Sequence, residues 1–397
     1  MLLTWYKKFS SQPHQPFFSS GILFFTLFMM LFIFIYSNIL TLDTSVLTYH
    51  AYSMVFVIFI QFFLGFLFVV FPRFLMQAEI PIKKYMTQFF IYFLSSLGIF
   101  LSLIFYSKIT TVFQILLLVG QILSFRLLYS IHKKSLVQIK EDTKWILIAF
   151  CIGLVSHFLF IVSNIDFKYS HFVSKVAINS GFYLFLFMII FVISQRMIPF
   201  FTTAKAPNYK INKSPKLLEI VFSLLVLKVL ILSFDNPKLN FISDIPLLFV
   251  ITKELIRWKL PFFRVPAIMW VLYLGLYWIP FALVISIIES FMAFYAPFIY
   301  FEKAVIHTLA LGYFITLLVG FGTRVILGHS GTTPHANKFA ISIFIALQFI
   351  VLLRIFSSIS MNFALDYIFF INLTATLLVL VLFIWSCEYI TILLKGK

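Results

Sequence analysis

Three histidines of this 397-residue chain stand in three different long apolar segments, at similar depths. His50 begins the second segment, His157 lies in the second half of the fifth, and His307 lies about two turns into the tenth. Neutral imidazole binds haem iron and copper, and a helical bundle holds a cofactor through ligands from separate helices. The three histidines therefore predict a cofactor site near the outer side of a membrane.

The segment after His50 adds a second type of metal ligand. At 100° per residue, His50, Met54 and Gln61 share one face of a helix. A methionine thioether suits copper(I), so Met54 joins the three histidines as a candidate metal ligand. The alternative is that Met54 is ordinary packing and that His50 caps an interface.

Arginines and one histidine gather at the opposite ends of the apolar segments. Arg324 and His329 lie in the glycine-rich run from Gly320 to Gly331, and Arg196 precedes a proline at the end of the sixth segment. Arginine pairs with carboxylates, so Arg324 and Arg196 are candidates for binding haem propionates or another anion. The alternative is that these arginines are basic anchors at the membrane surface. For His329 the sequence leaves open metal ligation, proton transfer and a structural hydrogen bond.

Lys228 lies within the seventh apolar segment, which offers it no acidic partner. An ionisable side chain at membrane depth marks a proton or anion path, or its ammonium group reaches back to the surface. The two cysteines, Cys151 and Cys387, are far apart within apolar segments and form no metal motif.

The elements that must position these residues are membrane helices. Hydrophobic residues make up 62% of the chain and charged residues 11%, with a mean hydropathy of +1.07, whereas soluble domains carry about 25% charged residues. Each membrane crossing needs about 20 apolar residues. We predict an all-α, polytopic integral membrane protein that forms a single transmembrane domain over 1–397. Its helices are expected at 17–40, 46–71, 85–106, 109–131, 145–165, 172–198, 217–235, 241–258, 267–288, 299–327, 338–357 and 362–394.

The basic residues predict the orientation of these helices. With the N-terminus inside, most of the 30 lysines and arginines fall on inside segments, as the positive-inside rule requires. An even number of helices then places both termini in the cytoplasm. The first apolar segment follows Lys7 and Lys8 without a clear cleavage site, which is typical of an uncleaved signal anchor. The net charge of +17 therefore reflects topology, and no nucleic-acid partner is expected.

Three motifs resemble signatures of the NnrS family. The longest is the run from His307 to Pro334, and the others are the stretches from His50 to Met54 and from Arg196 to Thr202. The family also has about twelve membrane helices in about 400 residues. The resemblance implies a haem- and copper-containing protein of the bacterial inner membrane, linked to nitric-oxide metabolism and to protection against nitrosative stress. It makes His50, His307, Arg324 and His329 the leading cofactor-site residues, with Arg196 in support.

One departure from the family bears on the metals. The family's second-helix motif usually reads His-Ala-His-Glu-Met, whereas Tyr52 and Ser53 replace the second histidine and the glutamate here. Copper is therefore less well supported than haem b.

Two main function classes follow from the sequence, and a structural assembly factor for a respiratory complex is a third possibility. The first is a haem or haem–copper protein that takes nitric oxide as a ligand, in contact with membrane lipid and with a quinone or respiratory electron donor as redox partner. The alternative is a secondary transporter of a small solute or ion, which the embedded Lys228 and Gln61 suit. Whether the protein is an enzyme, its oligomeric state and the number of its metals are not encoded in any recognisable motif.

Overall fold

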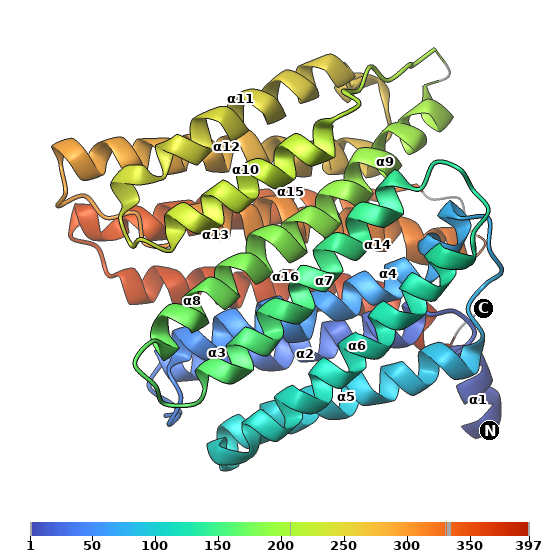
Figure 1. Cartoon of the computed structure of the whole chain (residues 1–397), viewed down its shortest axis with the longest axis horizontal. Helices are drawn as coiled ribbons and strands as arrows, with labels where there is room; N and C mark the ends of the chain where they lie inside the picture. The colour runs from blue at the N-terminus through green and yellow to red at the C-terminus, as the bar shows by residue number, and fades with distance from the viewer. Residues whose placement is uncertain (1, 207, 330, 332–334, 396–397) are drawn as a thin grey trace. The chain divides into compact units, whose positions relative to one another are not determined.

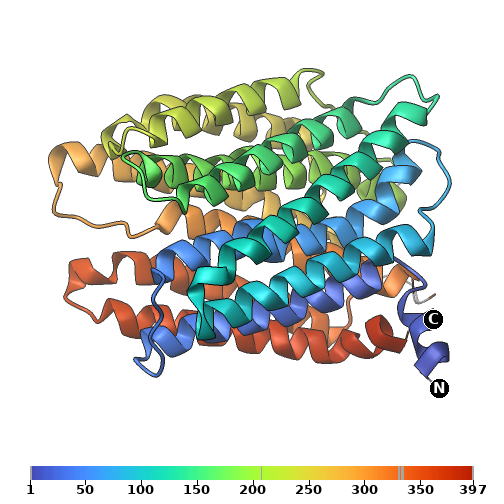
Figure 2. The same ribbon diagram turned by 60° about the horizontal axis from the view of Figure 1, so that its bottom comes forward.

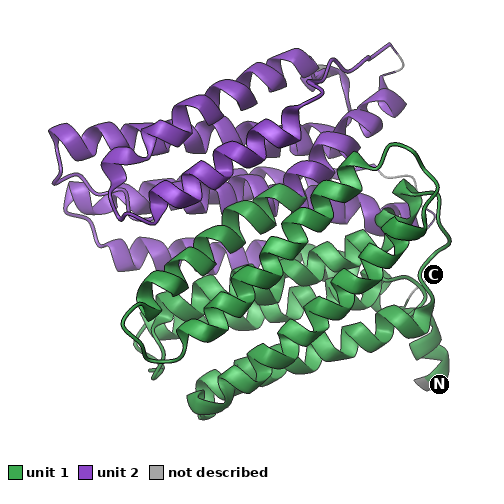
Figure 3. Cartoon of the chain, in the orientation of Figure 1, with its two compact units in different colours: residues 1–189, 382–397 green, residues 190–381 purple. Residues whose placement is uncertain are grey.

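The computed structural model describes residues 2–206, 208–329, 331 and 335–395. All regular structure in these ranges is helical (Figures 1 and 2). The predicted motif residues Ser330, Thr332, Thr333 and Pro334 and the predicted inside residue Lys397 lie outside the described residues. The chain divides into two compact units, residues 1–189 with 382–397 (unit 1) and residues 190–381 (unit 2) (Figure 3).

Unit 1 contains five long helical runs and the beginning of a sixth. Its elements are α1 (Leu2–Phe9), α2 (His14–Tyr36), α3 (Val46–Tyr52), η1 (Ser53–Ile58), α4 (Phe59–Phe74), α5 (Ile82–Phe105), η2 (Ser107–Ile109), α6 (Thr110–Lys134), α7 (Glu141–Ser163), α8 (Ser170–Ser180) and η3 (Gly181–Phe187), with the end of α16. Helix α2 packs on α4, α5 on α6, and α7 on α8 and η3. In Figures 1 and 2, helix α1 and the end of α16 lie at the same end of this unit.

Unit 2 contains the remaining helices. Its elements are α9 (Met188–Lys205), α10 (Leu217–Leu232), η4 (Pro237–Leu239), α11 (Phe241–Trp258), η5 (Phe262–Arg264), α12 (Ala267–Tyr295), α13 (Ala304–His307), η6 (Thr308–Ile315), α14 (Thr316–His329), α15 (Lys338–Ile359), η7 (Ser360–Phe363) and α16 (Tyr367–Lys395). The hairpin of α10 and α11 packs on α12, which also contacts η6 and α14. Glu254 organises the base of the hairpin by accepting hydrogen bonds from the Ser214 backbone N–H at 2.7 Å and from Trp258 Nε1 at 3.0 Å.

A helix is present at each of the twelve predicted places. The differences lie at the ends, where local geometry overrides hydropathy. The sixth run continues to Lys205 through Pro199, and the tenth begins at Ala304 because Lys303 has a left-handed backbone with φ of 54°. A left-handed residue cannot continue an α-helix, so it separates the 296–303 loop from the helix that follows.

Ten helical runs in the described residues are long and apolar enough to cross a membrane. This is the pattern of a multi-pass membrane protein. The two exceptions are α10, which has 16 residues, and α11, which carries Asp244, Lys253, Glu254 and Arg257. The helices of the α10–α11 hairpin are thus confirmed, but the number of spans and the side on which the termini lie stay predictions.

Candidate functional site

Three π-helical segments interrupt the three most buried of the long helical runs. They are η1 in the run Val46–Phe74, η3 in Ser170–Lys205 and η6 in Ala304–His329. The most apolar windows of these runs are 89%, 83% and 72% buried, against 28–61% for the other seven candidate spans. Short π turns inside α-helices are uncommon and often mark functional sites. The three family-type motifs of the sequence fall on these same three runs.

His50 stands three residues before η1. It is half-buried, and its ring lies 4.8 Å from the ring of Phe32 in α2. Met54, inside η1, is also half-buried. The two candidate ligands therefore lie in one short stretch at the end of a buried run.

Gln61 does not continue this stretch as the sequence predicted. It is fully buried among α2, α4 and α5, where its amide group bonds Ser20, Ser96 at 3.1 Å and the Val57 carbonyl at 2.9 Å. The predicted stripe assumed a constant step of 100° per residue, and the wider π turn between His50 and Gln61 breaks that step.

His157 is enclosed by protein on both ring nitrogens. Its side chain is fully buried, with Nε2 2.9 Å from the Tyr52 hydroxyl and Nδ1 2.8 Å from Gln121 Oε1. Phe56 stacks on the imidazole at 4.8 Å with an interplanar angle of 12°. Because Gln121 Nε2 donates to the Phe56 carbonyl at 3.0 Å, its Oε1 accepts, so His157 carries its proton on Nδ1 and Nε2 accepts from Tyr52. In this arrangement both ring nitrogens bond protein groups, so His157 as a metal ligand stays a prediction that requires one of these bonds to be broken.

Tyr52 and Gln121 are the residues of this site that the sequence analysis did not assign. Tyr52 was noted only as the replacement of a family histidine, and the structure gives it a specific partner in His157. Gln121 had one signal in the sequence, a polar side chain within an apolar helix, which is costly at membrane depth unless it is bonded.

His307 is the last residue of α13 and directly precedes η6. It is half-buried, and its Nδ1 lies 2.9 Å from the Lys303 carbonyl and 3.1 Å from Nη2 of Arg354. When Nδ1 of His307 carries the proton, it donates to the Lys303 carbonyl. When the proton is on Nε2, Nδ1 accepts from the Arg354 guanidinium. Arg354 is itself buried and donates from Nη1 to Ser358 at 2.5 Å. The sequence did not single out Arg354, because it reads as an outer-side basic residue.

The inner motifs meet at Arg324 and Phe201. The Arg324 guanidinium stacks over the Phe201 ring at 3.7 Å, and Phe201 in turn lies 6.3 Å from Phe321. Nη1 of Arg324 is buried and has no hydrogen-bond partner among the described residues. Arg196, on the same helix as Phe201, is half-buried. A stacked guanidinium with an unused buried N–H group is a candidate site for an anion.

His329 lies one turn beyond Arg324 and is half-buried. Its Nδ1 bonds the Val325 carbonyl of the preceding turn at 2.9 Å. His307 and Arg324 stand near opposite ends of one helical run, about 25 Å apart at 1.5 Å per residue. A metal bound at His307 and an anion bound at Arg324 therefore belong to separate sites.

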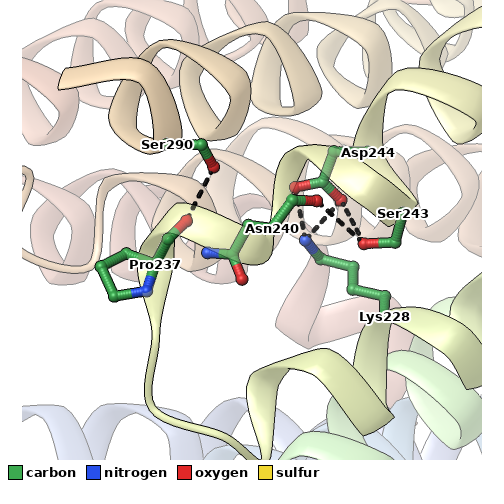
Figure 4. A network of polar contacts seen from close by, with 6 residues as sticks. All are labelled: Lys228, Pro237, Asn240, Ser243, Asp244 and Ser290. Atoms are coloured by element: carbon green, nitrogen blue, oxygen red, sulfur yellow. Dashed lines mark hydrogen bonds and ion pairs between the residues drawn. The ribbon is translucent and has the colours of Figure 1, made fainter. Parts of the chain in front are cut away.

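Lys228 has an acidic partner on the next helix. Its ammonium group lies 2.7 and 2.9 Å from the two carboxylate oxygens of Asp244, and both side chains are almost fully buried (Figure 4). Ser243 donates to the same carboxylate at 3.3 Å, and Ser290 of α12 bonds the Pro237 carbonyl beside it at 2.9 Å. The embedded charge that favoured a transporter is therefore neutralised by an ion pair.

No group of three or more His, Cys, Asp or Glu side chains in the described part of the chain is placed to hold a metal ion. The candidate ligands instead occur as single histidines, each beside a π turn.

A comparison with curated proteins gives no match. The family model described as NnrS protein matches residues 8–397, which is nearly the entire chain. The multi-pass helical architecture agrees with this match, and the chain belongs to the NnrS family.

Proposed function

We propose that this protein binds haem b and acts in the nitric-oxide response, protecting a bacterium against nitrosative stress from its cytoplasmic membrane. Both termini lie in the cytoplasm in this proposal, nitric oxide is the ligand, and a quinone or respiratory protein donates electrons. The proposal rests on membership of the NnrS family and on the placement of two histidines.

The placement of His50 and His307 is the observation that carries the proposal. Each ends or nearly ends a short α-helical stretch and is followed by a π turn in one of the most buried runs of the chain. Each is half-buried, neither fully enclosed by the protein nor freely exposed. A haem needs only one or two axial ligands, and single imidazoles at rigid positions meet that requirement.

A bound haem supplies an iron that coordinates nitric oxide. The chain's own residues then have distinct tasks. His50 and His307 provide imidazole ligands near the outer ends of their runs. At the other end of the second run, too far away to share that haem, Arg324 binds a separate anionic group such as a propionate of a second haem, with Arg196 and His329 on the same motifs. Phe201 holds the guanidinium plane in place by stacking on it.

Copper enters the proposal only through His50, His307 and Met54. His157 would join this set only after losing its hydrogen bond to Tyr52 or Gln121, because these two residues bond its two ring nitrogens. Tyr52 also replaces the second histidine of the family motif, so this chain offers fewer nitrogen ligands than the motif does.

The first test is a reduced-minus-oxidised absorption spectrum with metal analysis of the protein purified in mild detergent. We expect a Soret band with stoichiometric iron, which His50→Ala and His307→Ala each diminish or shift because an axial ligand is lost. His171→Ala is the matched control, since His171 is exposed on α8. Full haem content and unchanged spectra in both ligand variants would contradict the assignment, and a colourless, metal-free protein would favour the transporter.

The second test concerns the anion site. Arg324→Gln is expected to weaken retention of this second haem about tenfold to a hundredfold, because a hydrogen bond to a charged group contributes about 1.5–3 kcal/mol. Haem content is measured during dilution into detergent that contains a haem-scavenging protein. Arg257→Gln is the control, because Arg257 already bonds Asn212 at 3.0 Å. Equal retention in both variants would show that Arg324 does not bind a propionate.

A further inference from the structure

A chain of three buried side chains ends on the first π turn. Tyr52 donates to His157, His157 donates to Gln121, and Gln121 donates to the Phe56 carbonyl inside η1. The hydrogen bonds are 2.9, 2.8 and 3.0 Å long, and all three side chains are at most 2% exposed. They come from three different runs, so three helices are tied to one turn of backbone. We call these residues the Gln121 chain.

Unit 2 contains a second chain with the same order of donors and acceptors. Trp278 Nε1 donates to Gln348 Oε1 at 2.7 Å, Gln348 Nε2 donates to Thr316 Oγ1 at 3.3 Å, and Thr316 Oγ1 donates to the Leu311 carbonyl inside η6 at 3.1 Å. An indole N–H can only donate, so the direction of this chain is fixed by Trp278. We call these residues the Gln348 chain.

Both chains act on backbone that has left the α-helical pattern. In an α-helix each carbonyl accepts from the N–H four residues later, and in a π turn it accepts from the N–H five residues later. Carbonyls within the turn therefore point in different directions from those of an α-helix. Phe59 N–H bonds the Met54 carbonyl, and Thr316 N–H bonds the Leu311 carbonyl, five residues back in each case. In η1 the added donor is Gln121 of the neighbouring helix α6. In η6 it is Thr316 of the same run, whose hydroxyl in turn accepts from Gln348 of α15. A regular α-helix would misplace both carbonyls.

The register of each π turn sets the direction of the histidine before it. Collapse of a π turn into α-helix changes the register by one residue, which rotates the preceding stretch by about 100°. For η1 that stretch carries His50, and for η6 it carries His307. A rotation of this size would turn either imidazole toward a different neighbour.

We propose that Gln121 and Gln348 are positioning residues, which hold the π turns η1 and η6 in register and thereby fix the directions of His50 and His307. The role of the histidines as haem ligands rests on the proposed function, whereas the effect on register does not. The Gln121 chain also gives His157 and Tyr52 a role that requires no metal.

The test is a cysteine-accessibility scan of the stretch before η1. In a background with Cys151 and Cys387 replaced by alanine, single cysteines at 45–51 are reacted with a water-soluble maleimide. In the parent protein we expect the fastest reaction at the exposed positions Leu47 and Thr48 and protection at the buried Tyr49. In Gln121→Leu the pattern is expected to move by one residue, about 100° around the helix.

Gln114→Leu is the matched control. Gln114 is a buried glutamine on the same helix, but its Oε1 accepts from Asn164 at 2.7 Å, and it is not part of the Gln121 chain. Its loss removes a part-buried glutamine hydrogen bond from the same helix without touching η1. A structural role alone would make the two variants alike, so a shifted pattern in Gln121→Leu only is the expected result.

The second chain keeps the test decisive if Gln121→Leu fails to fold. Trp278→Phe removes only the indole donor and keeps a ring against Gly312 of η6, where a Cβ atom would lie 2.6 Å from Trp278 Cγ. Cysteines at 303–306 are then scanned, with Trp270→Phe of the same helix as the control. Unchanged patterns in Gln121→Leu and Trp278→Phe would overturn the proposal. The scan itself needs no haem. If the pattern shifts in a protein that binds no haem, the positioning role is supported and only the proposed haem function is contradicted.

Discussion

Lys228→Met is expected to lower the free energy of unfolding by about 3–5 kcal/mol, because it leaves Asp244 as an uncompensated buried charge. Asp244→Leu is expected to be destabilising but less costly, because Lys228 keeps an electrostatic interaction with Glu289. The double variant Lys228→Met/Asp244→Leu is expected to lie within about 1–2 kcal/mol of the parent protein, since replacing a buried ion pair by apolar side chains is often nearly neutral. The measurement is unfolding in mild micelles titrated with a denaturing detergent, followed by tryptophan fluorescence.

The geometry explains why the single and double changes differ. Lys228 is 1% exposed and Asp244 0%, so neither charge reaches water when its partner is removed. The pair joins α10 to α11, and the Ser290 bond to the Pro237 carbonyl joins the hairpin to α12. Loss of one charge therefore weakens the packing of the whole hairpin.

Lys238→Met provides the control for this cycle. Lys238 lies in the turn of the same hairpin, exposed, with its ammonium group 5.4 Å above the Phe294 ring. Its replacement is expected to cost less than about 1 kcal/mol, as for an exposed cation–π contact. A double variant as unstable as either single variant would show that the ion pair stabilises the fold beyond mutual neutralisation.

Hydropathy was sufficient to locate the helices. Long apolar runs between short polar loops leave few alternatives in a membrane, because every backbone polar group must be bonded internally. The α10–α11 hairpin was the least secure element, since Asp244, Lys253 and Glu254 lower its hydropathy, yet it is helical over Phe241–Trp258. Asp244 is neutralised by Lys228 of α10. Glu254 accepts from the Ser214 backbone and from Trp258, and Lys253 lies over the Phe249 ring.

The π turns and the partners of the buried polar residues could not be predicted from the sequence. A π turn adds one residue to a run that stays apolar throughout, so hydropathy does not detect it. The partners of His157 are 36 and 105 residues away, and Asp244 is 16 residues from Lys228 on another helix. Sequence reasoning could identify each of these polar residues as unusual, but packing alone shows which ones meet.

Gly181→Val is expected to lower the free energy of unfolding by about 3 kcal/mol, the upper end of the usual cost of overpacking. Gly181 begins η3 and lets this segment approach η1, because a Cβ atom there would lie 2.7 Å from Val55 Cγ1 and 2.9 Å from Phe56 Cζ. Valine is stiff at χ1, and the Phe56 ring is fixed between this contact and His157, so neither neighbour can move easily. The same unfolding titration measures the effect.

Gly181→Ala and Gly120→Ala separate the contact from helix propensity. Alanine stabilises a helix by about 1 kcal/mol relative to glycine at either position. At Gly120 the nearest atom to a new Cβ lies at 3.0 Å, a milder contact, so Gly120→Ala is expected to be nearly neutral. Gly181→Ala is expected to destabilise the protein despite the same gain in helix propensity. Equal stability of the two variants would show that Val55 and Phe56 of η1 move aside at little cost.

A double-mutant cycle then connects the glycine contact with the Gln121 chain. Phe56 supplies both the ring that meets Gly181 and the carbonyl that accepts from Gln121, so the two sites share one residue of the π turn. Residues that share a partner couple by about 0.5–3 kcal/mol, whereas independent sites add. Gly181→Val/Gln121→Leu is therefore expected to be less destabilised than the sum of the single variants. Strict additivity would mean that the two contacts stabilise η1 independently, and that the π register is not a single cooperative feature of this turn.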